Sequence, residues 1–197
     1  MPALSLSIDG ITLATVSTDG LNVLNVRVGG TVIADALADL DMSGGAYPDG
    51  GESTHLIWIG NQTVQAGQVI KVTMLTDEPT IRAGKTIDEF FAEDEPAPPA
   101  EAKSTSKIFD DLRNTPKRRS GFSFRVESSA GKRVITSTRP GDFSFDFSVL
   151  WDSWSPDCAK VSVHSCSLDE LEQNSPMHDF FRDRIRVGES IEFELTA

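Results

Sequence analysis

The sequence predicts a mostly β protein built from two related modules. Three observations lead to this prediction: apolar residues alternate with polar ones along most of the chain, glycine-containing turns separate these runs, and the pattern repeats with a constant offset of 121 residues. We expect two β-sandwich-like modules, residues 1–76 and 121–197, packed on each other as a pseudo-dimer. A charged linker with two short helices, residues 77–120, is expected to join them.

The repeat is clearest in the last strand of each module. Gly67 is followed by a polar residue and then by apolar residues at every second position, and Gly188 begins the same pattern. The same offset places Gly20 on Gly141. The alternation of apolar residues and the glycines between the runs match at this offset without a gap from about Ile11 to Leu75. We interpret the repeat as a duplication of one module.

Each module is expected to contain about six short strands. Asp9-Gly10 between alternating apolar runs predicts a hairpin, because both residues tolerate positive φ. The continuous apolar run 54–59 is typical of a strand buried on both sides. The first module is expected to form strands over 4–8, 11–16, 21–28, 38–43, 54–59 and 69–75, with a glycine-rich loop at 44–51.

The second module repeats these elements, with one difference. Ser167 followed three residues later by Glu170 resembles a capping box, which predicts a short helix at 168–173. A module of about 73 residues is near the lower limit for an independent core, so mutual packing of the two is expected. Its strands are expected over 122–127, 132–138, 143–150, 159–165, 175–180 and 186–195.

The linker contains two short helical patterns around a proline-rich stretch. Thr86 can cap the first helix, with Glu89 at its third position. Ile108, Phe109 and Leu112 form an apolar stripe at helical spacing in the second. We expect both helices to dock on the modules and the stretch 94–105 to be mobile.

Charge limits the classes of partner. The chain has a formal net charge of −12, and both modules are acidic, so nucleic acid and anionic membranes are unlikely partners. The N-terminal residues alternate as a strand does, and we expect neither a secretory signal nor a membrane span. Cys158 and Cys166 lie too far apart for a disulfide if one strand joins them, which favours a cytoplasmic location.

The motifs of common catalytic and cofactor sites are missing from the sequence. Gly84-Lys85-Thr86 ends like a phosphate-binding loop, but Pro79 stands where that loop needs its first glycine and a backbone amide. No nucleophile elbow, zinc-protease helix or dinucleotide-binding turn occurs. We therefore expect a non-catalytic protein without a cofactor.

Two weaker metal-site patterns stay open as alternatives. His164 and Cys166 share one face of a predicted strand, and Cys158 with His178 would complete a zinc set, although the spacing fits no common zinc pattern. Carboxylate pairs suited to calcium are Asp39 with Asp41 and Asp142 with Asp146. Surface and core roles explain the same residues.

Aromatic residues in loops give the strongest functional signal. Trp151 and Trp154 lie in a turn-rich stretch after a strand, and Tyr47 lies in the glycine-rich loop. Aromatic residues on the loops of a rigid scaffold are enriched at interaction surfaces. We therefore predict a protein-interaction module, such as an acidic adaptor, inhibitor or chaperone, with a basic partner. The alternative is a small-ligand or carbohydrate-binding β-sandwich.

Overall fold

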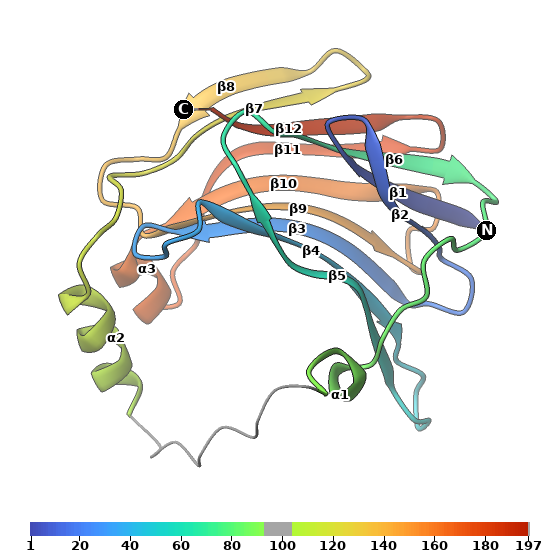
Figure 1. Cartoon of the computed structure of the whole chain (residues 1–197), viewed down its shortest axis with the longest axis horizontal. Coiled ribbons are helices and arrows are strands. Elements are labelled where there is room, and N and C mark those ends of the chain that lie inside the picture. Colours follow the sequence, from blue (N-terminus) through green and yellow to red (C-terminus); the bar gives the residue numbers. More distant parts are fainter. Residues whose placement is uncertain (93–103, 197) are drawn as a thin grey trace.

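The alternating runs form twelve strands in two six-stranded antiparallel sheets, seen in a computed structural model that describes residues 1–92 and 104–196 (Figure 1). Sheet A has the order β2 (Ile11–Ser17), β1 (Pro2–Ile8), β6 (Val69–Thr76), β12 (Ser190–Thr196), β7 (Ser123–Ser128) and β8 (Arg133–Ser137). Sheet B has the order β11 (His178–Arg186), β10 (Cys158–Cys166), β9 (Ser144–Asp152), β3 (Val23–Thr31), β4 (Ala38–Ala46) and β5 (Thr54–Val64).

The two related modules are packed as a pseudo-dimer, as predicted, and they share both sheets. Each module contributes three neighbouring strands to sheet A and three to sheet B. The modules meet at two central strand pairs, β6 with β12 and β3 with β9. Backbone hydrogen bonds therefore cross the boundary in both layers, and the sandwich has one core rather than two.

The strand register repeats with the offset found in the sequence. Val26 pairs with Met42 in the first module, and Phe147 pairs with Val163 in the second. At the centre of sheet A, Lys71 lies opposite Glu192, its own equivalent 121 residues later, and the two side chains form an ion pair of 3.1 Å. The modules are thus related by a pseudo-twofold axis. Their origin by duplication stays a prediction.

Glycines have two distinct roles in this fold. Gly67 and Gly188, aligned by the repeat, have φ of 83° and 87° and form equivalent turns. Gly30 and Gly44 instead lie inside β3 and β4, so these strands extend beyond their predicted ends. An added Cβ on Gly30 would lie 2.5 Å from the carbonyl oxygen of Leu37, and one on Gly44 would lie 2.4 Å from that of Val23. Close backbone approach explains these two glycines.

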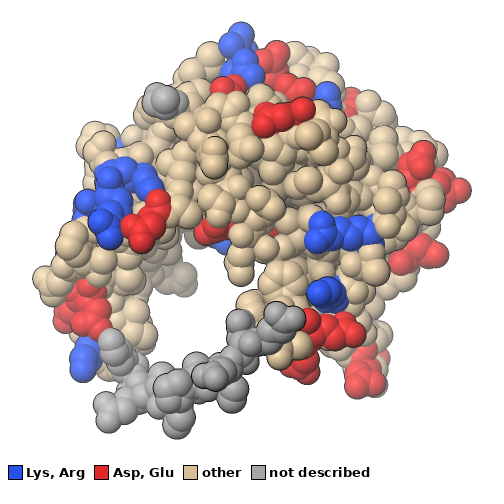
Figure 2. All heavy atoms as spheres, in the orientation of Figure 1, with Lys and Arg blue, Asp and Glu red and all other residues tan. Residues whose placement is uncertain are grey.

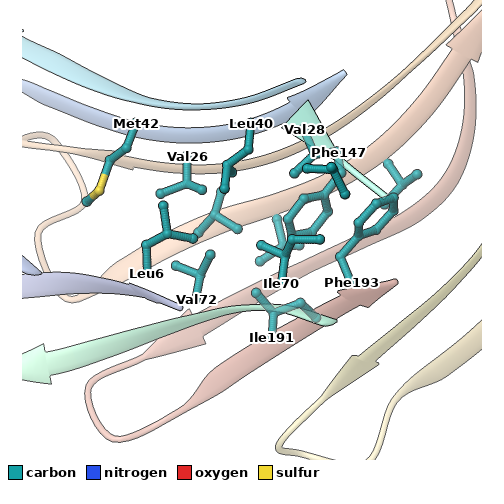
Figure 3. Close-up of a cluster of buried hydrophobic side chains, with 14 of the residues drawn as sticks. Leu6, Val26, Val28, Leu40, Met42, Ile70, Val72, Phe147, Ile191 and Phe193 are labelled. Carbon is teal, nitrogen blue, oxygen red and sulfur yellow. The ribbon is translucent and has the colours of Figure 1, made fainter. Parts of the chain in front are cut away.

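The inward faces of both sheets form a continuous apolar core (Figure 3). Val72 and Ile70 from the first module face Phe193 and Ile191 from the second near the pseudo-twofold axis. Phe147 stacks on Phe193 across the two sheets, with ring centroids 4.6 Å apart. Aliphatic side chains dominate the first module's share of the core, which has no buried phenylalanine, whereas the second's share includes seven phenylalanines.

The first linker helix has the predicted cap, and both linker helices dock on the sandwich. α1 (Ile87–Phe90) begins with a capping box between Thr86 and Glu89, and it lies against β5. α2 (Thr105–Asn114) contacts α3 (Leu168–Glu172), whose Ser167–Glu170 capping box is also confirmed. The predicted mobile stretch 94–105 falls outside the described residues, apart from its last two, where α2 begins.

β5 is an edge strand that the linker covers. Trp58 and Ile59, on opposite faces, are both buried, as the continuous apolar run predicts. Lys85 forms an isolated antiparallel bridge with Ile57 along the strand's free edge. Phe90 packs over Gly60, where an added Cβ would lie 2.5 Å from its ring.

Candidate functional site

The structure brings two of the three predicted aromatic residues to one end of sheet B. Asn22 immediately precedes β3, which lies between β4 and β9. Its side-chain oxygen accepts a hydrogen bond from the Tyr47 amide at 2.5 Å, and its carbonyl accepts one from the Ser153 amide at 2.9 Å. Neighbouring strands are ~4.8 Å apart, so the turns that carry Tyr47 and Trp154 begin about 10 Å from each other. We call this end of the sheet the aromatic edge.

Tyr47 is held in a defined position on the aromatic edge. Its hydroxyl lies 2.7 Å from Nδ1 of His55, which belongs to the neighbouring strand β5. Gly45 provides the space for this ring, because an added Cβ would lie 2.9 Å from the tyrosine hydroxyl. The ring is 44% exposed. One side of the tyrosine is therefore fixed by protein contacts and the other is available to a ligand.

The carboxylate of Asp152 stabilises the turn that carries Trp154. Asp152 accepts a hydrogen bond from the Ser155 amide at 3.0 Å and forms an ion pair of 2.6 Å with Lys160. The hydrogen bond from Lys160 lowers the pKa of the Asp152 carboxyl and keeps it ionised. Trp154 at the tip of the turn is 83% exposed. The turn is rigid at its base and presents a large aromatic ring to solvent.

The prediction that Trp151 lies on a loop and contacts a partner is wrong about its position. β9 extends to Asp152, and Trp151 is fully buried in the core. Its indole Nε1 donates a hydrogen bond to the carbonyl of Pro156 at 3.0 Å. Trp151 thus anchors the turn from inside, and alternation along the strand places its neighbour Asp152 on the outer face.

The sequence pattern missed Asn22 and the acidic residues around the aromatic edge. Exposed carboxylates occupy the three turns that meet there, and none of them forms an ion pair within the described residues: Asp19, Asp49, Glu52 and Asp157. No lysine or arginine occurs in residues 18–22, 46–53 or 152–157. The local charge is therefore negative. Asn22 could have been identified only if the pairing of β3 with both β4 and β9 had been known, because that pairing brings the two turns to its side chain and carbonyl.

The histidine and cysteine residues proposed for zinc do not converge. Cys158 and Cys166 are free thiols at opposite ends of β10, as expected for residues of one strand. Burial raises the pKa of the Cys166 thiol, which disfavours the thiolate that a metal needs. His178 packs edge-on against Phe180. No group of three or more metal-ligating residues occurs in the described part of the chain.

Three of the four carboxylates proposed for calcium are engaged in protein contacts. Asp146 forms an ion pair with Arg27, and burial nevertheless raises the pKa of this carboxyl. Asp41 accepts a hydrogen bond from the Asn61 amide at 3.0 Å. Asp142 is buried and accepts from Ser165 and Arg139. Asp142 and Asp146 therefore bind different partners and do not form a shared carboxylate pair.

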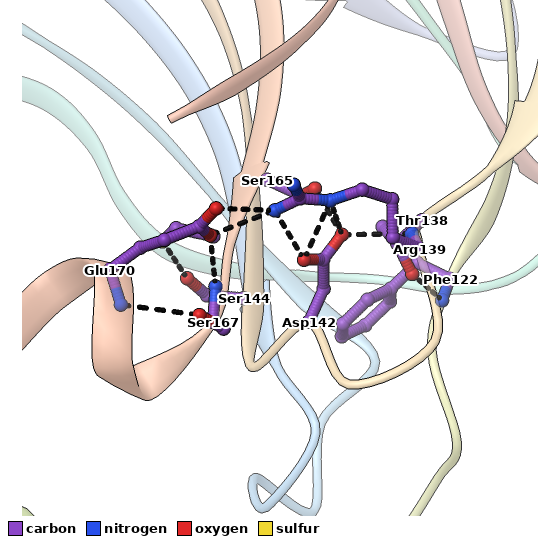
Figure 4. A network of polar contacts seen from close by, with 9 residues as sticks. Phe122, Thr138, Arg139, Asp142, Ser144, Ser165, Ser167 and Glu170 are labelled. Carbon is purple, nitrogen blue, oxygen red and sulfur yellow. Dashed lines mark hydrogen bonds and ion pairs between the residues drawn. The ribbon is translucent and has the colours of Figure 1, made fainter. Parts of the chain in front are cut away.

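A polar network around Arg139 is structural (Figure 4). Arg139 bonds to Asp142 at 2.9 Å and to Glu170 of α3 at 2.8 Å. Glu170 also accepts from the Ser167 amide, and this bond and Arg139 together lower the pKa of the glutamate. Each charge in the network has a partner. The network joins the β8–β9 loop to α3.

The Gly-Lys-Thr sequence at residues 84–86 serves packing. The Lys85 amide donates to the carbonyl of Ile57 at 2.9 Å, and the Thr86 amide donates to Glu89 at 2.8 Å. Gly84 lies against Trp58, where an added Cβ would meet the indole at 3.0 Å. These amides are used within the fold, so the segment offers no phosphate cradle.

On the face shown in Figure 2, acidic and basic side chains occur in small separate groups, and no large patch of one sign is seen. Among the described residues, none of the helices is long and apolar enough to cross a lipid bilayer. Comparisons with protein-family models, with curated proteins and with solved structures found no match.

Proposed function

We propose that this protein is a non-catalytic protein-interaction module that binds a basic segment of a partner protein at the aromatic edge. The observation that carries the proposal is that Asn22 ties the turns of Tyr47 and Trp154 to one strand end. Two aromatic rings on a rigid base supply contact area at low entropic cost. Together they form the most exposed aromatic surface of the two modules.

The charge around the aromatic edge supports a basic partner. Asp19, Asp49, Glu52 and Asp157 have no basic partner among the described residues. Their unpaired carboxylates attract lysine and arginine side chains during encounter and weaken binding as salt increases. We place the protein in the cytoplasm as part of this proposal, because its two cysteines are free thiols.

The proposal is tested by selecting peptides from a random display library on the immobilised full chain. Enriched peptides should contain lysine and arginine, and their affinity should fall as salt is raised. Trp58 and Trp151 are buried, so a shift in the exposed tryptophan emission on peptide addition reports Trp154. Replacement of Tyr47 and Trp154 together by alanine should abolish binding.

A matched control uses two exposed apolar residues of sheet A. Ile11 and Ile135 are 70% and 62% exposed, and their replacement by alanine should leave binding unchanged. Equal loss in both double variants, or selected peptides without basic residues, would reject the proposal. Saturable binding on a glycan array, lost only with Trp154→Ala, would instead support the carbohydrate-binding alternative.

A further inference from the structure

A basic groove lies on the outer face of the second module's half of sheet B. It has a volume of about 930 Å³ and runs along β9, β10 and β11. Ser148 and Ser162 lie on its floor, and Met177 from the loop after α3 lines one side. In a chain of net charge −12, the groove is lined by four basic side chains and two acidic ones: Lys160, Arg182, Arg184, Arg186, Asp179 and Asp183.

Two of these four cations have no carboxylate partner in the described part of the chain. Lys160 pairs with Asp152 and Arg182 pairs with Asp179, each at 2.6 Å. Arg184 and Arg186 are exposed and form no ion pair within the described residues. They are two positions apart on β11 and point to the same face, so their like charges are close. An anionic group bound between them would relieve this repulsion.

The equivalent face of the first module shows what kind of segment fits such a site. There the linker covers β5 with a short acidic helix and two aromatic residues, Ile87-Asp88-Glu89-Phe90-Phe91. Under the offset of 121 residues, the cross-strand pair of Thr63 and Asp39 in the first module corresponds to the pair of Arg184 and Lys160 in the second. The second module therefore presents cations where the first has a threonine and an aspartate, and no described segment covers β11 in the same way.

The free edge of β11 is closed to strand addition. The Arg184 amide donates to Asp183 at 2.9 Å, and the Arg186 amide donates to Glu189 at 2.8 Å. Lys132 donates to the carbonyl of Arg182. Because these backbone groups already have partners, a ligand reaches β11 through the arginine side chains on its outer face.

We propose that this groove binds an acidic segment of a partner protein that carries an aromatic residue. Arg184 and Arg186 bind its carboxylates, since guanidinium groups pair with carboxylates through two parallel hydrogen bonds. The aromatic ring packs on Leu150 and Met177, which line the groove and supply an apolar wall and a thioether. This site adjoins the aromatic edge at Lys160, but it is not lined by Tyr47 or Trp154 and it takes a ligand of the opposite charge.

The probe is a fluorescent synthetic peptide with the sequence of residues 84–92, added to the full chain. Anisotropy should show saturable binding that weakens with added salt. Arg184→Glu with Arg186→Glu should weaken binding by roughly a hundredfold, about tenfold for each lost charged pair. Arg184→Gln with Arg186→Gln should give a smaller loss, because it removes the positive charges without adding negative ones.

A matched control changes the net charge equally at other sites. Arg82→Glu with Lys107→Glu reverses two exposed cations that do not line the groove, and it should leave the affinity unchanged. A peptide with lysine at both acidic positions should not bind. Tyr47→Ala with Trp154→Ala should leave binding of the acidic peptide intact, so this test is independent of the proposed function.

Three outcomes would overturn the proposal. They are the absence of saturable binding, equal losses in the groove variant and its control, and equal binding of the lysine-substituted peptide. Sedimentation velocity of the unliganded chain tests whether a second copy of the chain binds in the groove instead. A dimer that dissociates with Arg184→Glu and Arg186→Glu would identify a second copy of the chain as the ligand of the groove.

Discussion

β5 and β11 occupy equivalent edges of sheet B, yet they face different surroundings. Their ladders share one register up to Leu40 and its equivalent Val161. Beyond that point the β4–β5 ladder shifts on both sides of Met42, whereas the β10–β11 ladder shifts once, after Val163. β5 is covered by the linker, whereas β11 faces an open basic groove. The repeated scaffold therefore constrains the inward side chains and the strand pairing, and it leaves the outward faces free to differ.

The cores of the two modules differ in side-chain size at equivalent positions. Val72 corresponds to Phe193, and Val26 corresponds to Phe147, under the offset of 121 residues. All four are fully buried. The two phenylalanines stack on each other, and their cross-strand neighbours in the first module are the smaller Ile70 and Val28.

The largest expected effect is on this shared core. Phe193→Ala should lower the free energy of unfolding by about 4 kcal/mol, because it removes a ring stacked on three other phenylalanines. Val72→Ala at the equivalent position should cost about 2 kcal/mol. Urea unfolding should show one transition in both variants. Two separate transitions would contradict a single shared core.

The second effect concerns the cover on β5. Phe90→Ala should lower the free energy of unfolding by about 1.5 kcal/mol, because the ring no longer covers Gly60. Hydrogen exchange of the Ile57 amide, which donates to Lys85, should become faster. Phe91→Ala is the control, since Phe91 is 43% exposed and should cost less. Unchanged exchange at Ile57 would show that β5 does not depend on the linker.

The third effect depends on pH and concerns the base of the aromatic edge. The pKa of Asp152 is lowered in the folded protein, chiefly by Lys160, so its contribution is present above the unfolded value of about 3.9 and is lost as pH falls through the folded value. Asp152→Asn should cost about 1 kcal/mol at pH 7. Urea unfolding at about pH 3 should show a smaller difference between variant and wild type. A difference that grows on acidification would contradict the ion pair.

The smallest effect is expected at the open edge. Arg184→Glu with Arg186→Glu should change the free energy of unfolding by less than about 0.5 kcal/mol, because neither side chain has an ion-pair partner in the described residues. A large loss in urea unfolding would show that these arginines stabilise the fold, which would weaken their assignment to a ligand.

Much of the fold could be predicted from local patterns. The capping boxes at Thr86 and Ser167 and the repeat offset are local or periodic signals, and each is found in the structure. The position of Trp151 was not predictable in this way, because Asp152-Ser153 resembles a turn until the pairing of β9 with β3 is known. The aromatic edge depends on Asn22. Its bonds to both turns form only because β3 pairs with β9, which is distant in sequence.

The sharing of sheets by the two modules also depends on contacts distant in sequence. Alternation in β6 and β12 indicates strands but does not indicate that Lys71 lies opposite Glu192. This pairing also has a consequence for assembly. A homodimer of the first module would place Lys71 opposite another Lys71, and one of the second would place Glu192 opposite Glu192. Like charges directly opposite each other destabilise a strand pair, so the modules favour each other.

The most direct test of the shared sandwich is to produce residues 1–92 and 104–197 as separate chains. Each alone should give a disordered far-ultraviolet circular dichroism spectrum, because each would expose one side of a core that spans both sheets. Equimolar mixing should restore a β spectrum and a single cooperative thermal transition. A cooperative transition in either chain alone, as a monomer, would contradict a core that needs both modules.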